Sequence, residues 1–405
     1  MEKTSRKLTI KYALLQSTYW ISQCTIYSFA AIYLQYRNFN NTQIGIVLSL
    51  SAILSIILQP VVSAFADKSK KKTVRNIILI LLLIAFASAI LLNIKANSLL
   101  FIGCVFAIIT AIQFTINPLL NSYALEYINK GYPFNYGLAR GTGSIAFAIT
   151  SFFLGHGVSR FSGAIIVPFF LISYVFLFLS ASFFRLKDTD KEAANLSKNH
   201  RIEDISDENE NPPSTILGFF IKYKRFTLML VGITMLFYAH SLINTYLINI
   251  MENVGGDSSD MGLSLTIAAA LELPTMAAFA YIIKKLRCHT IIKTASFFFL
   301  MKSLFIWLAP NVNIVHLSQA FQMLSFALFT PASVYYVNSI INKEDRNKGQ
   351  AMMGVATIGL SGTIAYITGG NLLDTRDPSY MLLMGFIVSI VGFIIVCFST
   401  EKSKI

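Results

Sequence analysis

Charged residues are scarce in this chain, and few of them lie inside its long apolar runs. Asp, Glu, Lys and Arg make up 13% of the 405 residues, whereas hydrophobic residues make up 55%. A soluble domain carries about 25% charged residues. The composition therefore excludes an ordinary soluble domain and indicates a protein that folds in a lipid bilayer.

The sequence motifs of metal and catalytic chemistry are missing as well. The four cysteines stand singly, with neither metal-ligand spacing nor a disulfide pattern: Cys24, Cys104, Cys288 and Cys397. The sequence contains no His-Glu-x-x-His or Gly-x-Ser-x-Gly motif and no cluster of carboxylates in its apolar runs. We therefore expect no enzymatic activity, no metal and no cofactor.

Twelve apolar runs are each long enough for a helix of about 20 residues, the length that spans the hydrocarbon core. Glu272 interrupts one run, Lys302 interrupts another, and Arg140 borders a third. The runs are Tyr12–Tyr36, Asn38–Ala66, Asn76–Ile94, Ala96–Leu125, Gly141–Ser159, Phe161–Phe184, Phe226–Met251, Met261–Ile283, Thr294–His316, Leu317–Asn342, Gly349–Leu373 and Pro378–Thr400. They predict an all-α membrane protein with twelve transmembrane helices.

Basic residues mark one face of the predicted membrane protein. If both termini are cytoplasmic, 27 of the 33 Lys and Arg residues fall in the termini and cytoplasmic loops, against Arg37, Lys95, Arg160 and Arg376 in the opposite loops. The positive-inside rule then predicts a multi-pass protein of the cell membrane with both termini in the cytoplasm. This distribution also accounts for the net charge of +13 without a nucleic-acid partner.

A polar segment divides the twelve runs equally and predicts three parts: a six-helix bundle over 1–184, a cytoplasmic linker over 185–225 that we expect to be mostly mobile, and a second six-helix bundle over 226–405. The halves also repeat. Pro118 recurs 213 positions later as Pro331, and Gly45 recurs 217 positions later as Gly262. A repeat of six spans predicts two bundles in the same orientation around a central cavity, as in alternating-access transporters.

The loop after the second run carries an acid followed by a basic cluster, in the sequence SAFADKSKKK from Ser63 to Lys72. This pattern resembles the Gly-x-x-x-Asp-Arg-x-Gly-Arg-Arg loop of the major facilitator superfamily, although both glycines are replaced. The resemblance extends over essentially the whole chain and implies that Asp67, Lys68 and Lys71 form a gate on the cytoplasmic side. The alternative is a solvated interface carboxylate among lysines.

Around the fifth run, the sequence from Phe134 to Phe147 resembles that of the lactose-permease-like proton symporters. The resemblance implies that Arg140 donates forked hydrogen bonds to a sugar and that Phe147 stacks on its ring, chemistry that suits a planar guanidinium. In the alternative interpretation, Arg140 extends its charged group to the membrane interface. The second half resembles this family only in part, since Gln322 and Ser325 stand where it has a histidine and a glutamate.

Glu272 matches the family's sugar-binding and proton-coupled carboxylate, and Lys302 falls where the family has an arginine. Since an intramembrane charge marks a functional site by default, we expect Glu272 and Lys302 to pair and to couple transport to protonation. A static structural pair is the alternative. Neutral amides and one histidine are candidate solute ligands, with interhelical packing as the alternative: Asn117, Asn121, His240, Asn244 and Gln322. The aromatic residues of the first run, Trp20 among them, are interpreted chiefly as packing residues.

These observations predict a secondary active transporter, acting as a monomer in the bilayer. We expect it to carry a sugar or oligosaccharide, a nucleoside or an aromatic acid by alternating access, in symport with protons and driven by the proton gradient. A proton-driven exporter of drugs or metabolites from the same superfamily is the alternative. A sensor that has lost transport also fits the pattern.

Overall fold

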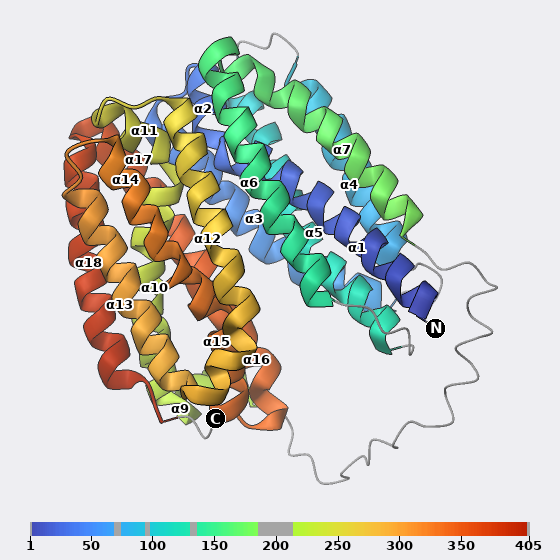
Figure 1. The fold of residues 1–405 in the computed structure, drawn as a ribbon, viewed down its shortest axis with the longest axis vertical. Coiled ribbons are helices and arrows are strands. Elements are labelled where there is room, and N and C mark those ends of the chain that lie inside the picture. Colours follow the sequence, from blue (N-terminus) through green and yellow to red (C-terminus); the bar gives the residue numbers. More distant parts are fainter. Residues whose placement is uncertain (1, 69–73, 94–97, 130–135, 185–213, 403–405) are drawn as a thin grey trace.

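The computed structural model describes residues 2–68, 74–93, 98–129, 136–184 and 214–402, and in these ranges the chain is helical with no strand (Figure 1). The predicted all-α class is confirmed. The start of the first helix and the end of the last helix, next to the two termini, lie in the lower part of the molecule in Figure 1. The helices of the first half are α1 (Glu2–Gln23), a π-helical turn (Cys24–Ser28), α2 (Ala30–Tyr36), α3 (Asn41–Lys68), α4 (Val74–Leu91), α5 (Leu99–Asn129), α6 (Tyr136–Phe161), a 3-10 turn (Gly163–Ile165) and α7 (Ile166–Phe183).

The second half follows the same plan after a short helix, α9. Several of its spans are divided into consecutive helical pieces, because 3-10 or π-helical turns interrupt the α-helix. Its helices are α9 (Ile216–Lys222), α10 (Lys224–Thr245), α11 (Leu247–Asn253), α12 (Ser258–Lys285), α13 (Cys288–Trp307), α14 (Val312–Gln319), a 3-10 turn (Ala320–Met323), α15 (Phe326–Ile340), a 3-10 turn (Lys343–Asp345), α16 (Arg346–Gly354), a π-helical turn (Val355–Leu360), α17 (Ser361–Thr375) and α18 (Pro378–Ser399).

Ten helical segments within the described residues are long and apolar enough to cross a membrane. The segments Glu2–Tyr36 and Tyr136–Phe161 are also long, but they contain more polar residues. With them, the arrangement is consistent with the predicted twelve spans. Most of the predicted linker, residues 185–213, lies outside the described residues, and its end forms α9.

The limits predicted for the ninth span are wrong at both ends. The helix α13 begins at Cys288 rather than near Thr294, and it ends at Trp307 rather than at His316. The charge-free run misled the prediction at both ends. Lys293 lies within the first two turns of the helix, and the turn at Pro310 and Asn311 separates this span from α14.

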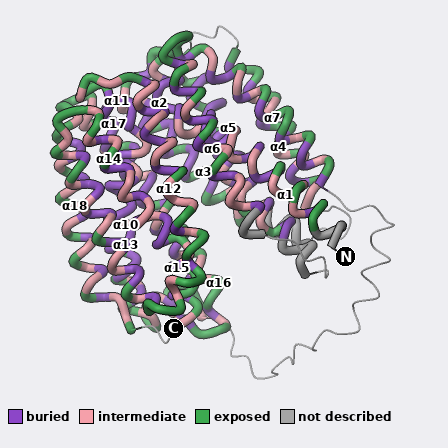
Figure 2. Tube along the Cα trace, in the orientation of Figure 1, coloured by how far each residue is buried: buried purple, intermediate pink, exposed green. Residues whose placement is uncertain are grey.

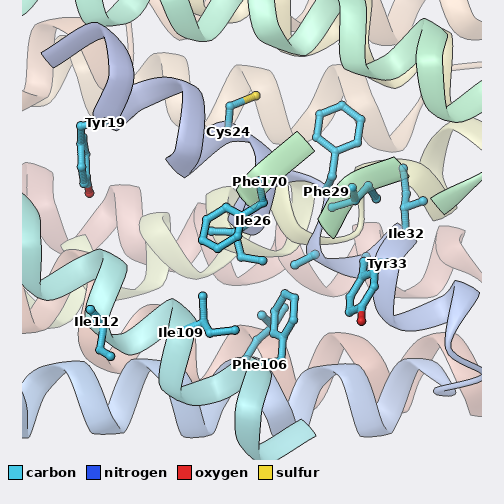
Figure 3. Close-up of a cluster of buried hydrophobic side chains, with 14 of the residues drawn as sticks. Tyr19, Cys24, Ile26, Phe29, Ile32, Tyr33, Phe106, Ile109, Ile112 and Phe170 are labelled. Carbon is cyan, nitrogen blue, oxygen red and sulfur yellow. The ribbon is translucent and has the colours of Figure 1, made fainter. Parts of the chain in front are cut away.

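Buried and exposed residues alternate along the helices (Figure 2). Figure 3 shows part of the core of the first half, in which Ile26 lies beside Phe170 of α7. Cys24, Phe29 and Phe106 of α5 belong to the same cluster. Many large apolar side chains are instead exposed, such as Phe153 at 66%. In a membrane protein these outward residues contact lipid, so they need no further partner.

Two helix starts are built alike and lie at matching places in the repeat. At α3, Asn40 and Gln43 exchange side-chain to backbone hydrogen bonds of 2.8 and 3.0 Å. At α12, Asp257 and Asp260 form the same reciprocal cap. In both helices a glycine follows the cap residue by five positions, Gly45 in one and Gly262 in the other.

These two glycines let the halves meet backbone to backbone. A Cβ on Gly45 would lie 2.1 Å from the carbonyl oxygen of Tyr366 in α17, and a Cβ on Gly262 would lie 2.4 Å from that of Ser151 in α6. No other residue fits such an approach. The repeated glycine found in the sequence therefore marks the two helix crossings, α3 on α17 and α6 on α12, that join the halves.

Candidate solute and proton site

Arg140 lies near the start of α6, against the first helix. Its guanidinium carbon is 4.4 Å from the centre of the Trp20 ring in α1. The Trp20 ring in turn meets Phe147 edge to face, with ring centres 6.2 Å apart. The two residues that the resemblance singled out, Arg140 and Phe147, are thus brought together by Trp20, which the sequence analysis had interpreted as a packing residue.

A buried polar chain in the first half leads to the same ring. The Trp20 indole N–H donates to Gln16 Oε1 at 3.2 Å, and Gln16 Nε2 donates to the Tyr12 hydroxyl at 2.6 Å. The Tyr12 hydroxyl then donates to Asn121 Oδ1 at 3.3 Å. Asn121, a predicted solute ligand, therefore stabilises the packing of α5 on α1 in this structure.

Three side chains from three spans form a relay in the second half. Lys302 Nζ in α13 donates to Gln322 Oε1 at 2.8 Å, and Gln322 Nε2 donates to Glu272 Oε1 in α12 at 2.9 Å. Glu272 and Lys302 are thus joined through the amide, without a direct ion pair between them. Gln322, which replaces a titratable histidine of the family it resembles, is the link between the two charges.

The donor and acceptor roles in this relay are fixed by chemistry. An ammonium can only donate, so the amide oxygen of Gln322 must face Lys302, and the amide N–H must face Glu272. The relay therefore suits an ionised Glu272, which accepts a charge-assisted hydrogen bond. Lys302 is 1% exposed, and a charge so deeply buried depends on such partners.

The contact between α6 and α12 extends from the crossing at Gly262 toward Arg140 and Glu272, since a Cβ on Gly141 would lie 3.7 Å from Leu273 Cδ2. The Thr266 hydroxyl of α12 donates to the Ala148 carbonyl of α6 at 3.0 Å. The positive charges of Arg140 and Lys302 both act through space on the Glu272 carboxyl. Glu272 thus lies within the electrostatic influence of a cation of the first half and a cation of the second.

His240 lies in α10 beside this relay, stacked on Phe326 with ring centres 5.5 Å apart. Its Nε2 lies 2.8 Å from Asn244 Nδ2 and accepts from it. The buried Nδ1 of His240 and the buried Oδ1 of Asn117 find no hydrogen-bond partner among the described residues. Buried polar atoms normally have partners, so these two residues stay candidates for solute ligands.

The predicted gate falls largely outside the described residues. Asp67 and Lys68 end α3, but their side chains are not described, and Lys71 lies in the undescribed segment 69–73.

On the side opposite the termini, hydrogen bonds join the halves at two helix ends that the sequence analysis did not single out. Asp374 in α17 accepts from the backbone N–H groups of Asn41 and Thr42 at 3.1 and 2.7 Å. Ser159 in α6 donates to Asp257 at 2.6 Å, a bond that lowers the pKa of the Asp257 carboxyl. We call these contacts the α17–α3 clamp and the α6–α12 clamp.

Comparison with known proteins places this geometry in a family. The profile of the MFS_1 like family matches residues 12–384. The maltose permease of Geobacillus stearothermophilus is 22% identical over 384 residues, covering 94% of this chain and 91% of the permease. The uncharacterized transporter YwbF of Bacillus subtilis (strain 168) is 22% identical over 371 residues, covering 91% of this chain and 88% of that protein.

Solved structures agree in fold. A crystal structure of a point mutant of the nucleoside transporter NupG superposes with a TM-score of 0.79 at 13% identity, over 97% of this chain and 100% of that one. A second NupG structure gives 0.74 over 97% and 98%. The protein is a membrane-spanning transporter rather than an enzyme. The chain belongs to the MFS_1 like family, within the major facilitator superfamily.

Proposed function

We propose that the protein imports a small, hydroxyl-rich organic solute together with protons. The observation that carries this proposal is the relay Lys302–Gln322–Glu272. Its only acid is Glu272. Arg140 lies in the neighbouring part of α6, where a Cβ on Gly141 would be 3.7 Å from Leu273 Cδ2. The named relatives, a maltose permease and a nucleoside transporter, support a sugar or a nucleoside as the solute. An aromatic acid fits the sequence analysis but has less support from the neutral amides near the relay.

In this proposal, a proton on Glu272 removes the charged acceptor of the Gln322 N–H group. The relay then weakens, and Lys302 loses the partner through which its charge is balanced. A solute that binds Arg140 and the unpaired atoms of Asn117 and His240 stabilises the rearranged site. Protonation and solute binding therefore favour each other, which is the requirement for symport.

The proposed cycle alternates access to this site. The clamps hold the halves together on the side opposite the termini, which corresponds to a state open toward the termini. With the basic loops and both termini in the cytoplasm, this state faces the cytoplasm. Return to the outward state requires both clamps to break. The protein acts as a monomer in the cell membrane, and the proton gradient supplies the energy.

Proteoliposomes with an internal pH dye and labelled maltose or uridine test the proposal. We expect solute-dependent proton uptake in the parent, and loss of accumulation in Glu272→Gln with retained solute exchange, because exchange needs no net release of a proton. Glu252→Gln is the matched control, since Glu252 is an exposed carboxylate at the end of α11. Proton-driven accumulation by Glu272→Gln would contradict the coupling role, and solute extrusion against protons would instead support the exporter.

A further inference from the structure

Trp20 contacts the candidate site although its sequence position, in a row of aromatic residues in α1, is typical of packing. It is only partly buried, and the ring face is occupied by the Arg140 guanidinium at 4.4 Å. The chain has one other tryptophan, Trp307, which stacks on Phe386 in the second half with ring centres 5.4 Å apart. The two tryptophans therefore have different neighbours, and only Trp20 contacts a cation.

An aromatic ring face can hold a guanidinium by its charge, whereas a hydrogen-bond acceptor must occupy one of its N–H groups. The π face attracts the charge and fixes the plane of the group, but it uses none of the in-plane N–H donors. The contact with the Trp20 ring thus holds the Arg140 guanidinium in place without itself using these donors.

The orientation of the Trp20 ring is itself fixed on three sides. Its N–H is held by Gln16, which is fully buried, and its edge packs with Phe147. Its remaining side lies against Gly143 of α6, where a Cβ would be 2.3 Å from Trp20 Cδ1. The absence of a side chain at Gly143 therefore permits the ring to lie beside α6, under the guanidinium.

We propose that Trp20 is a positioning residue for solute recognition, which holds the Arg140 guanidinium near the start of α6 and thereby sets the affinity for a solute with paired oxygens. This inference rests on the proposed function, in which Arg140 binds the solute. Proton coupling through Glu272 is a separate element of that function. The two can therefore fail independently.

The test uses the full chain in the Trp307→Phe background, so that Trp20 is the sole tryptophan. KM and Vmax for maltose and for uridine are measured in proteoliposomes. We expect Trp20→Leu, which removes the cation–π contact, to raise KM about tenfold, and Trp20→Phe, which weakens it, to raise KM about threefold. Vmax should stay within about twofold of the parent value. Gly143→Ala should raise KM similarly, because it displaces the ring without removing it.

Tryptophan emission tests the contact without any solute. Arg140→Gln should shift the emission maximum of Trp20, whereas Arg160→Gln should not, because Arg160 lies over Phe161 at the far end of α6. An unchanged emission in Arg140→Gln overturns the proposal, as does a KM within about twofold of the parent in both Trp20→Leu and Gly143→Ala. Accumulation by Glu272→Gln would overturn proton coupling and leave the KM and emission results standing.

Discussion

Gly155 of α6 and Gly262 of α12 lie backbone against backbone, so that a Cβ on Gly155 would be 2.8 Å from the Cα of Gly262. The related crossing is equally close, since a Cβ on Gly370 of α17 would be 2.1 Å from the carbonyl oxygen of Asn41 in α3. The two halves are therefore joined at two points where one methyl group would separate the helices.

Gly155→Ala should destabilise the closed crossing by about 1–3 kcal/mol, the usual cost of overpacking. We expect a lower thermal unfolding temperature in detergent and a reduced rate of uptake. Gly354→Ala is the control, because nothing lies within 4 Å of a Cβ at that position, and alanine favours a helix. Equal effects of the two substitutions would show that the close approach at Gly155 does not matter.

The α17–α3 clamp should govern opening on the side opposite the termini. Asp374→Ala removes hydrogen bonds between halves, whereas Asp377→Ala removes a comparable cap within the second half, where Asp377 accepts from the N–H groups of Ser379 and Tyr380. Both should lower stability by about 1 kcal/mol. Only Asp374→Ala should increase the fraction of molecules in which the two halves separate on the side opposite the termini.

Opening can be measured with a cysteine at a position that the closed halves cover. Ser49 is 3% exposed and donates to the Thr363 carbonyl of the other half. In a background without the native cysteines, Ser49→Cys should react with an impermeant maleimide about tenfold faster when Asp374 is alanine. If maleimide reacted as fast in the Asp377→Ala protein as in the Asp374→Ala protein, the α17–α3 clamp would have no specific role in opening.

Gln322→Leu should leave Lys302 and Glu272 without their shared partner. We expect a loss of about 2–3 kcal/mol in the free energy of unfolding, because buried charged groups are left unsatisfied. Gln59→Leu is the control, since Gln59 makes no hydrogen bond to a described residue. Adding Lys302→Met to Gln322→Leu should restore part of the stability, and a purely additive double substitution would contradict the relay.

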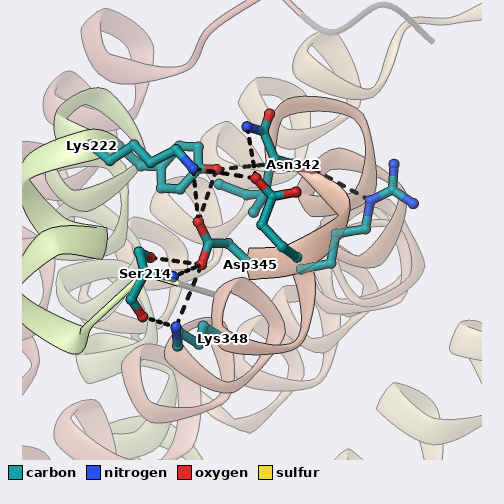
Figure 4. Close-up of polar contacts among 9 residues, drawn as sticks. Ser214, Lys222, Asn342, Asp345 and Lys348 are labelled. Atoms are coloured by element: carbon teal, nitrogen blue, oxygen red, sulfur yellow. Dashed lines mark hydrogen bonds and ion pairs between the residues drawn. The ribbon is translucent and has the colours of Figure 1, made fainter. Parts of the chain in front are cut away.

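Asp345 holds the end of α9 against the α15–α16 connection (Figure 4). It is fully buried, accepts from the Ser214 hydroxyl at 2.7 Å and from Lys222 Nζ at 3.1 Å, and lies 3.5 Å from Lys348 Nζ. The hydrogen bond to Asp345 raises the pKa of Lys222 above its usual 10.5. A raised lysine pKa stabilises the fold below the unfolded pKa, and this contribution is lost as pH rises through the folded value.

Lys222→Met should therefore lower the unfolding temperature by the same amount at pH 6 and pH 9, and by less only above about pH 10.5. Lys224→Met, two positions away and also exposed, should have little effect at any pH. Thermal unfolding over this pH range provides the measurement. A difference that already declines between pH 6 and pH 9 would argue against the ion pair.

The spans, the repeat and the charges of the site could be predicted because each leaves a local signal. Apolar runs give spans, and Arg140, Glu272 and Lys302 stand out as charges within or beside them. The contacts between distant helices could not be predicted. Trp20 and Arg140 are 120 positions apart, and whether they meet depends on the rotation of α1 and α6, which packing against other helices decides.

The role of Gln322 was hidden for a related reason. In the sequence it is a neutral substitute at a position where the lactose-permease-like proteins have a titratable residue. Its bridging role depends on the assembly of α12, α13 and the 3-10 turn Ala320–Met323, where an amide can act as both donor and acceptor between two charges. The clamps could not be predicted because Asp257 and Asp374 lie at helix ends, where a carboxylate that caps its own helix has the same sequence pattern.

The clamps have a kinetic consequence for the proposed cycle. Each turnover must break and remake hydrogen bonds whose strength is independent of the cargo, so they add a fixed barrier to every crossing, loaded or empty. Stronger clamps would slow the return of the empty carrier and limit throughput. Weaker clamps would let the protonated carrier reorient without solute and dissipate the proton gradient. In the proposed cycle, Ser159, Asp257 and Asp374 would thus set a compromise between speed and leakage, at a distance from the groups proposed to recognise the solute.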